Sequence, residues 1–482
     1  MGALFHPFFS RVPLPNHACC GMLVSPDRRA APPCHNKDEV SAMSTCTQLI
    51  HTLKNGGYDP ALAALYALDG SAQKLDGARG RCVRIAEAFA ARYGAQAQGA
   101  TLFSGPGRTE IGGNHTDHQH GRVLCGSVDL DMLACAAPNG LDVVRIQSEG
   151  YPPLKISLND LAPKKEEENT SAALVRGVAA KIKELGFELS GFDACANSTV
   201  LSGSGLSSSA AYETLVGNIF NHFCCRDKLD PVTIAKIGQY AENVYFGKPC
   251  GLMDQMGSSV GGAVAIDFKD PANPVVERVD YDFSKSGHAL CIVDTGSSHG
   301  DLTDDYAAVT REMGAVAAHF GKAVLREVPL EDFQAALPAL RSECGDRAVL
   351  RAMHFYSDDR RAAQEADALK TGNFEAFLNL VNASGLSSSL CLQNTWSIHD
   401  PSQQAIPLAL TAAEYLLDGM GACRVHGGGF AGTIQAWVPE DYLTVFKNGM
   451  EALFGAGKCH VLHIRPQGGC VVAASSASPV SG

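Results

Sequence analysis

Residues 203–213 read Gly-Ser-Gly-Leu-Ser-Ser-Ser-Ala-Ala-Tyr-Glu. The two glycines disfavour a helix, whereas the residues from Ala210 onward favour one. We therefore expect a loop that leads into a helix N-terminus with serine hydroxyls in its first turn. The free N–H groups and the dipole of such a terminus favour an anion, and phosphate is the natural candidate. A serine-capped helix without a ligand is the alternative. A Walker A loop is excluded, because the chain has no Gly-Lys-Ser/Thr sequence.

A second glycine-bearing segment, residues 105–121, reads Gly-Pro-Gly-Arg-Thr-Glu-Ile-Gly-Gly-Asn-His-Thr-Asp-His-Gln-His-Gly. We expect a short strand over 100–104 to end here and a bent polar loop to follow. The loop offers one fixed cation and several hydrogen-bonding groups to a polyhydroxylated ligand: Arg108, Asn114, His115 and Asp117. A plain surface loop is one alternative. A metal site at His115, His118 and His120 is another, although their spacing matches no recognised helix-borne site.

Two further segments contain glycines near possible functional residues. Residues 426–433, His-Gly-Gly-Gly-Phe-Ala-Gly-Thr, match Gly-x-Gly-x-x-Gly. A dinucleotide site needs a helix next, but residues 433–438 alternate like a strand, which argues against a nicotinamide cofactor.

Residues 247–257 place Asp254 in a glycine-rich turn after an expected helix over 231–246. That helix has Asp230 as a plausible N-cap and Pro231 at its first position.

The remaining periodicity indicates mixed helices and strands. We expect further helices near 80–94, 170–185, 208–223, 303–319, 331–341, 359–369 and 374–382. We expect further strands near 123–135, 142–147, 263–268 and 289–294, and a strand, glycine loop and strand over 422–438.

Together these segments resemble the galactokinase family of the GHMP small-molecule kinases, over roughly residues 101–438. The family's first motif, Gly-Arg-x-Asn-x-x-Gly-Glu-His-x-Asp-Tyr, stands here with Glu110, Asn114 and His118 in place of its Asn, Glu and Tyr. The second, Gly-x-Gly-Leu-Ser-Ser-Ser-Ala, is intact over 203–210. The third, Gly-x-Gly-Phe-Gly-Gly, has Ala431 in place of a glycine, and Cys-Gly-x-Met-Asp-Gln stands at 250–255.

The resemblance implies an α+β, two-domain GHMP kinase fold with the active site in the cleft between the domains. We expect residues 43–275 to form the N-terminal domain, with the sugar and phosphate motifs. Residues 276–482 would form the C-terminal domain, with the third glycine-rich motif. Residues 1–42 are rich in proline and lack periodicity, so we expect a disordered extension or a segment absent from the natural protein.

The resemblance also implies an ATP- and Mg²⁺-dependent kinase that phosphorylates the anomeric C1 hydroxyl of galactose. Asp254 would be the base, and Arg108 would stabilise that carboxylate and the transferring phosphoryl group. The ATP-binding residues would be Gly203, Ser204, Gly205, Leu206, Ser207, Ser208 and Ser209. The sugar-binding residues would be Asn114, His115, Thr116, Asp117, Gly251 and Tyr306. Ser209 and Glu242 would hold Mg²⁺, which prefers oxygen ligands.

The departures from the first motif leave other functions open. Asn114 stands where the family's Glu contacts the hydroxymethyl group of the sugar, so a kinase for N-acetylgalactosamine or arabinose is an alternative. A sensor that binds galactose and ATP without turnover is another. Such sensors are expected to lose part of the second motif. The retained Ser209, Arg108 and Asp254 favour catalysis.

Charge and composition narrow the class of partner. The net charge is −12 and no dense basic run occurs, so we expect binding neither to nucleic acid nor to an anionic membrane surface. No apolar stretch approaches the roughly 20 residues of a membrane span. The 17 cysteines are an odd number and include no Cys-x-x-Cys pair, which favours free thiols in a reducing cytoplasm. We expect a monomer that binds a small sugar and ATP.

Overall fold

The computed structural model describes residues 45–68, 70–200, 205–248, 250–297 and 302–474. The extension expected over residues 1–42 lies outside these ranges. Within them, no helix is both long and apolar enough to cross a membrane.

The larger sheet of the described chain has eight strands in the order β12-β1-β2-β5-β3-β4, with β6 paired to β2 and β7 to β6. The strands are β1 Thr101–Gly112, β2 Arg122–Pro138, β3 Val143–Ser148, β4 Leu154–Ser157, β5 Phe192–Ser198, β6 Ala263–Asp267, β7 Val275–Val279 and β12 Cys470–Ala474. Strands β3 and β5 are parallel, and the other pairs are antiparallel. The long β2 pairs with β6 near its start and with β5 near its end.

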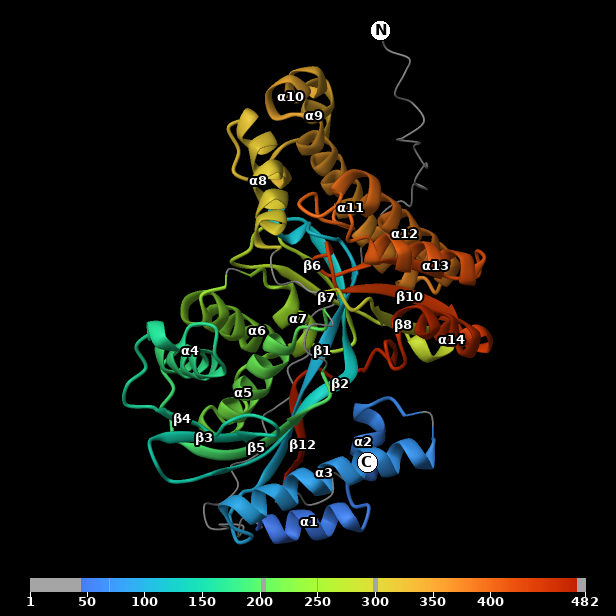
Figure 1. The fold of residues 1–482 in the computed structure, drawn as a ribbon. Helices are drawn as coiled ribbons and strands as arrows, with labels where there is room; N and C mark the ends of the chain where they lie inside the picture. Colours follow the sequence, from blue (N-terminus) through green and yellow to red (C-terminus); the bar gives the residue numbers. More distant parts are fainter. Residues whose placement is uncertain (1–44, 69, 201–204, 249, 298–301, 475–482) are drawn as a thin grey trace, which may run out of the picture. The chain divides into compact units, whose positions relative to one another are not determined.

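Side chains alternate between the two faces of this sheet, as the strand period of two requires. Phe103, Ala134 and Ala136 pack into a core with α4 (Ser171–Glu184) and α5 (Ser208–Cys224). Their neighbours Leu102, Leu133 and Cys135 pack into a second core with α1–α3. Those helices span Cys46–Lys54, Asp59–Leu65 and Ala72–Tyr93. Figure 1 shows α1–α3 and α4–α5 around the same end of the sheet.

The smaller sheet has the order β11-β8-β10-β9. Its strands are β8 His288–Asp294, β9 Ala422–His426, β10 Thr433–Pro439 and β11 Cys459–Leu462. One face packs against α13 (Ala405–Leu417) and α14 (Leu443–Phe454). The other, with Trp437, packs against α12 (Phe374–Ser387) and against Leu124 and Val128 of β2. This shared core joins the two sheets.

Four helices form a further core with one another: α8 Thr303–His319, α9 Leu330–Ala335, α10 Leu337–Cys344 and α11 Asp346–Lys370. Phe430 joins them from the loop between β9 and β10, so this core reaches the third glycine-rich segment.

Most expected elements are confirmed, with three corrections. The expected strand over 100–104 continues to Gly112, because its pairing with β2 runs past the glycines with two register shifts. The expected helix over 331–341 is two helices, with a proline in the first turn of α10. Asp254 lies in the first turn of α7 (Met253–Ser259), not in an irregular turn. The N-cap at Asp230 is confirmed, since its carboxylate accepts from the Thr233 N–H at 2.7 Å.

A buried ionic cluster ties the chain's C-terminal part to the larger sheet. Asp131 of β2 is fully buried and accepts hydrogen bonds from Arg81 and from the hydroxyls of Ser104 and Tyr66. Arg465 also lies 3.2 Å from this carboxylate, shortly before β12 pairs with β1. Burial alone would raise the pKa of Asp131, but the two guanidinium groups hold it below its usual value.

Replacing Asp131 with Asn should lower the free energy of unfolding by about 3–5 kcal/mol, because two largely buried guanidinium groups lose their shared counter-ion. Urea denaturation followed by circular dichroism measures this change. The same substitution at Asp76, which pairs with Arg79 at the surface, should cost less than about 1 kcal/mol. Equal effects of the two substitutions would contradict the structural role of Asp131.

Candidate active site

An ion pair between two segments far apart in the chain forms the centre of the site. Arg108 of β1 donates through Nε to Oδ1 of Asp254 at 2.8 Å, and its Nη2 lies 2.7 Å from the same oxygen. The Ser207 hydroxyl donates to the other carboxylate oxygen at 2.7 Å. The structure therefore brings together the expected base, the expected arginine and the serine turn.

The charge state of Asp254 follows from this pairing. Burial would raise the pKa of its carboxyl group, but the Arg108 charge and the Ser207 hydrogen bond together hold that pKa below its usual value. Asp254 is consequently an ionised carboxylate at neutral pH. It can accept a proton from a ligand placed beside it.

The serine turn lies against β1. The backbone N–H of Arg108 donates to the Leu206 carbonyl oxygen at 3.1 Å, and its guanidinium also donates to the Gly205 carbonyl. Helix α5 then begins at Ser208, as expected. Gly203 and Ser204, the first two expected ATP-binding residues, lie outside the described residues.

The expected metal ligands also meet. Ser209 Oγ lies 3.0 Å from Oε1 of Glu242, which belongs to a π-helical turn, Ala241–Phe246, at the end of α6 (Pro231–Tyr240). The Lys248 ammonium lies 3.3 Å from the same oxygen. A hydroxyl and a carboxylate suit a hard divalent cation such as Mg²⁺. No group of three or more His, Cys, Asp or Glu residues converges as metal ligands among the described residues.

The expected sugar-binding residues fall into two kinds. Asn114 and Thr116 are fully buried, and their side chains make internal hydrogen bonds. The Asn114 amide donates to Glu110 Oε1 at 2.8 Å and to the Gly427 carbonyl at 2.7 Å. The Thr116 hydroxyl lies 2.8 Å from the Gly113 carbonyl oxygen. These two side chains fix the segment in place.

His115 and Tyr306 lie together against the third glycine-rich loop. Their ring centroids are 6.4 Å apart, His115 Nε2 lies 2.9 Å from the Gly428 carbonyl, and the Tyr306 hydroxyl donates to the Gly429 carbonyl at 3.0 Å. A carbonyl oxygen can only accept, so Nε2 carries the proton of the His115 ring. Burial, followed by repulsion from His118, lowers the pKa of His115 to about 4.

Asp117 and Gly251 connect these groups to the base. Asp117 begins a short 3-10 turn, Asp117–Gln119. A Cβ atom built on Gly251 would lie only 2.2 Å from Asp117 Oδ2, so a larger residue here would displace the Asp117 carboxylate. Because Gly251 precedes Asp254 by three residues, the segments 105–121 and 247–257 meet near the Arg108–Asp254 pair.

The chain matches known proteins in the same regions. The galactokinase galactose-binding signature matches residues 87–138, and the GHMP kinases N terminal domain matches residues 173–262. A galactokinase of Streptomyces coelicolor is 30% identical over 378 residues, which is 77% of this chain and 92% of that protein. The chain belongs to the galactokinase family.

Solved structures show the same fold. The crystal structure of Lactococcus lactis galactokinase complexed with galactose gives a TM-score of 0.67 at 23% identity, covering 80% of this chain and 97% of that one. The Methanococcus jannaschii mevalonate kinase gives 0.54 at 15% identity, covering 76% and 98%. The chain therefore has the two-domain α+β fold of the GHMP kinases.

Two departures from the first motif of the galactokinases contact each other. Glu110 and Asn114 occupy the places of the family's Asn and Glu, and their side chains are joined by the 2.8 Å hydrogen bond described above. Glu110 also accepts from the buried Arg424 of β9 at 2.6 Å. Relative to the family motif, the carboxylate is now at position 110 and the amide at position 114, within one buried pair.

Sequence reasoning missed several residues around the site. Arg424 had no local signal, because its role depends on the pairing of β9 with β10 beside β1. Gln255 and Lys248 lie in residues 247–257, where nothing in the local pattern marks them as functional. Glu213 ends the serine segment and shows only helix propensity. Lys248 and Gln255 contact Glu242 directly, and Glu213 is linked to it through Gln255.

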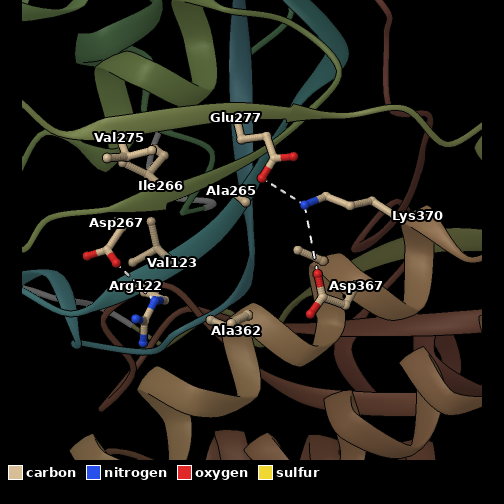
Figure 2. A pocket seen from close by; sticks show the side chains of 12 residues that line it. Arg122, Val123, Ala265, Ile266, Asp267, Val275, Glu277, Ala362, Asp367 and Lys370 are labelled. Carbon is tan, nitrogen blue, oxygen red and sulfur yellow. Dashed lines mark hydrogen bonds and ion pairs between the residues drawn. The ribbon is translucent and has the colours of Figure 1, made fainter. Parts of the chain in front are cut away.

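A separate cavity of about 230 Å³ lies between β6, β7 and α11. Figure 2 shows Lys370 reaching both Glu277, at 2.7 Å, and Asp367, at 3.8 Å, across its mouth. Arg122 pairs with Asp267 at 3.0 Å on the other side. None of the residues that line this cavity is an expected site residue, and its charged side chains are paired with one another.

The tautomer and pKa of His115 can be tested directly. The C–H signals of His115 in an NMR titration should stay constant from pH 8 to pH 5 and shift only near pH 4, because burial disfavours the imidazolium. A His115→Gln variant assigns the signal. A titration midpoint between 6 and 7 would contradict a ring that is neutral at pH 5 and above.

Proposed function

We propose that this chain transfers the γ-phosphoryl group of ATP to the C1 hydroxyl of galactose, which gives galactose 1-phosphate and ADP. Membership of the galactokinase family supports an ATP-dependent sugar kinase. The observation that carries the proposal is the Arg108–Asp254 ion pair beside Ser207, in a chain that retains the family's phosphate loop.

Asp254 is the proposed base. Its carboxylate is ionised at neutral pH and would accept the proton of the C1 hydroxyl as the oxygen attacks phosphorus. An anomeric hydroxyl is more acidic than an ordinary alcohol, so a carboxylate with a low pKa can serve. The proton ends on Asp254 and leaves to solvent after the products dissociate.

Arg108 is proposed to hold the base and to stabilise the transferring group. Its Nε and Nη2 fix one oxygen of Asp254, and Ser207 fixes the other. This geometry limits rotation of the carboxylate, which favours a productive alignment with the sugar. The positive charge of Arg108 would also offset the negative charge that spreads over the phosphoryl oxygens.

The nucleotide would lie along residues 203–209, with its phosphates at the N-terminus of α5. Ser209 and Glu242 are the proposed ligands of Mg²⁺, and their oxygen atoms fit this hard cation. A bound divalent cation would neutralise charge on the phosphate oxygens. Lys248 adds a positive charge beside the same carboxylate.

The sugar would bind among the residues that the resemblance implied. His115, Asp117, Gly251 and Tyr306 are proposed to contact its hydroxyls. Asn114 and Thr116 are proposed to shape this subsite, because their side-chain groups are bound within the protein.

We also propose that the protein is a cytoplasmic monomer. The free thiols of all 14 described cysteines support the cytoplasmic location.

A kinase of the same family with another sugar is the second candidate. The observation that favours it is the Asn114 amide, which is fully buried and bonded to Glu110 at the place of the family's sugar-binding Glu. Losing a charge-assisted hydrogen bond costs about 1.5–3 kcal/mol, which is enough to change the preference among sugars.

A coupled assay of ADP release over a panel of sugars tests the function. We expect galactose to give the highest kcat/KM, with N-acetylgalactosamine and arabinose lower. Higher kcat/KM for either of those sugars would establish the second candidate. Binding of galactose and ATP without ADP release with any sugar would show a sensor instead of an enzyme.

The Asp254→Asn variant should turn over about 10²–10⁴ times more slowly than wild type, because the amide cannot accept the hydroxyl proton. Steady-state kinetics measure the loss, and thermal unfolding checks that the variant is folded. Asp142→Asn, the same change at an exposed position, is the control. A folded Asp254→Asn protein with near-normal turnover would remove Asp254 from the mechanism.

A further inference from the structure

The two oxygens of the Glu242 carboxylate face different partners. Oε1 faces the phosphate loop, where Ser209 lies at 3.0 Å and Lys248 at 3.3 Å. Oε2 accepts a hydrogen bond from Nε2 of Gln255 at 2.7 Å. The carboxylate is therefore held by its inner oxygen and presents its outer oxygen to the place where a cation would bind.

Gln255 has a second carboxyl partner. The same Nε2 donates to Oε2 of Glu213 at 3.0 Å, so the two hydrogens of one amide group serve two carboxyl groups. The opposite orientation of the amide would place its carbonyl oxygen against both Glu213 and Glu242. Glu213 thus favours the orientation in which Gln255 donates to Glu242.

This arrangement is buried and closely packed. Glu213, Gln255 and Glu242 are exposed by at most 1%. Helix α6 approaches them at Gly238, where an added Cβ atom would lie 3.0 Å from Glu213 Oε2 and 3.2 Å from Gln255 Cγ. Two buried carboxyl groups joined by one amide are costly compared with apolar side chains of the same volume. Their presence here calls for a role other than packing.

We propose that Gln255 and Glu213 are positioning residues that orient Glu242 for binding the nucleotide-bound divalent cation. Gln255 acts directly on Glu242, and Glu213 acts through Gln255. This inference rests on the proposed metal site at Ser209 and Glu242. Groups that orient a metal ligand in this way typically change metal affinity by about 10–100-fold when they are removed.

Binding of Mn²⁺ in the presence of ADP, followed by electron paramagnetic resonance of the free ion, tests the proposal without turnover. In Gln255→Met the dissociation constant of Mn²⁺ should rise about 10–100-fold. In Glu213→Met it should rise less, because the amide still reaches Glu242 but is no longer oriented. Glu213→Gln should restore affinity close to wild type, since its amide oxygen can accept the same hydrogen bond.

Two further variants complete the experiment. Ser209→Ala, which removes a proposed ligand, should also weaken Mn²⁺ binding. Gln435→Met makes the same change at another fully buried glutamine, which donates to Thr109 and to the Glu110 carbonyl. It should leave the Mn²⁺ affinity unchanged. Thermal unfolding of each variant separates loss of the metal site from loss of the fold.

The outcomes separate this inference from the proposed function. Wild-type Mn²⁺ affinity in folded Gln255→Met and Glu213→Met proteins overturns the inference, whatever the kinase assay gives. A wild-type protein that binds no Mn²⁺ with ADP also overturns it. A wild-type protein that binds Mn²⁺ with ADP but phosphorylates no sugar contradicts the proposed function, while the effects of the Gln255 and Glu213 variants still support the positioning role.

Discussion

The Arg108–Asp254 ion pair is the interaction on which the arrangement of the site depends. Its partners are 146 residues apart in the chain and come from a sheet strand and a short helix. A guanidinium that is only 6% exposed needs a partner for its charge, and Asp254 of α7 supplies it to Arg108 of β1. Ser207 joins the same carboxylate, which brings the serine turn to the same point.

The two sheets contribute different parts of the site. The larger sheet and its helices carry Arg108, the serine turn, Glu242 and Asp254. The β9–β10 loop of the smaller sheet supplies carbonyl groups that hold His115, Asn114 and Tyr306. The segment that the galactose-binding signature covers is therefore fixed from both sides. The proposed sugar-binding segment is thus held in part by backbone groups of the smaller sheet.

The sequence predicted which motif residues lie together better than it predicted their supporting contacts. The serines at 207–209, Arg108 and Asp254 belong to motifs with local glycine and helix signals, and the structure brings them together. The continuation of β1 through Gly105, Pro106 and Gly107 was not predictable from local signals, because pairing with β2 overrides the turn preference of those residues. Helix α11 was predicted only over its second half, near 359–369, since the interior side of its first half includes buried charged residues such as Arg351 and Asp358, which interrupt the apolar period.

The contacts around Glu242 show the same limit. Glu213 and Gln255 are 42 residues apart, and no pattern in either segment connects them. Glu110 and Asn114 were visible as departures from the family motif. Only the geometry shows that the two side chains are joined by one hydrogen bond. Relations of this kind depend on how the elements pack, and a single sequence does not record them.

The pairing of β12 with β1 has a consequence for how the protein forms. Residues 470–474 lie about 370 positions after their partners at 101–104 and complete the edge of the larger sheet. During synthesis, the backbone groups along this side of β1 therefore stay unpaired until residues 470–474 have been made. Contacts of such long sequence separation slow folding. Before residues 470–474 are in place, the nascent chain exposes an unpaired strand edge, which is a template for aggregation.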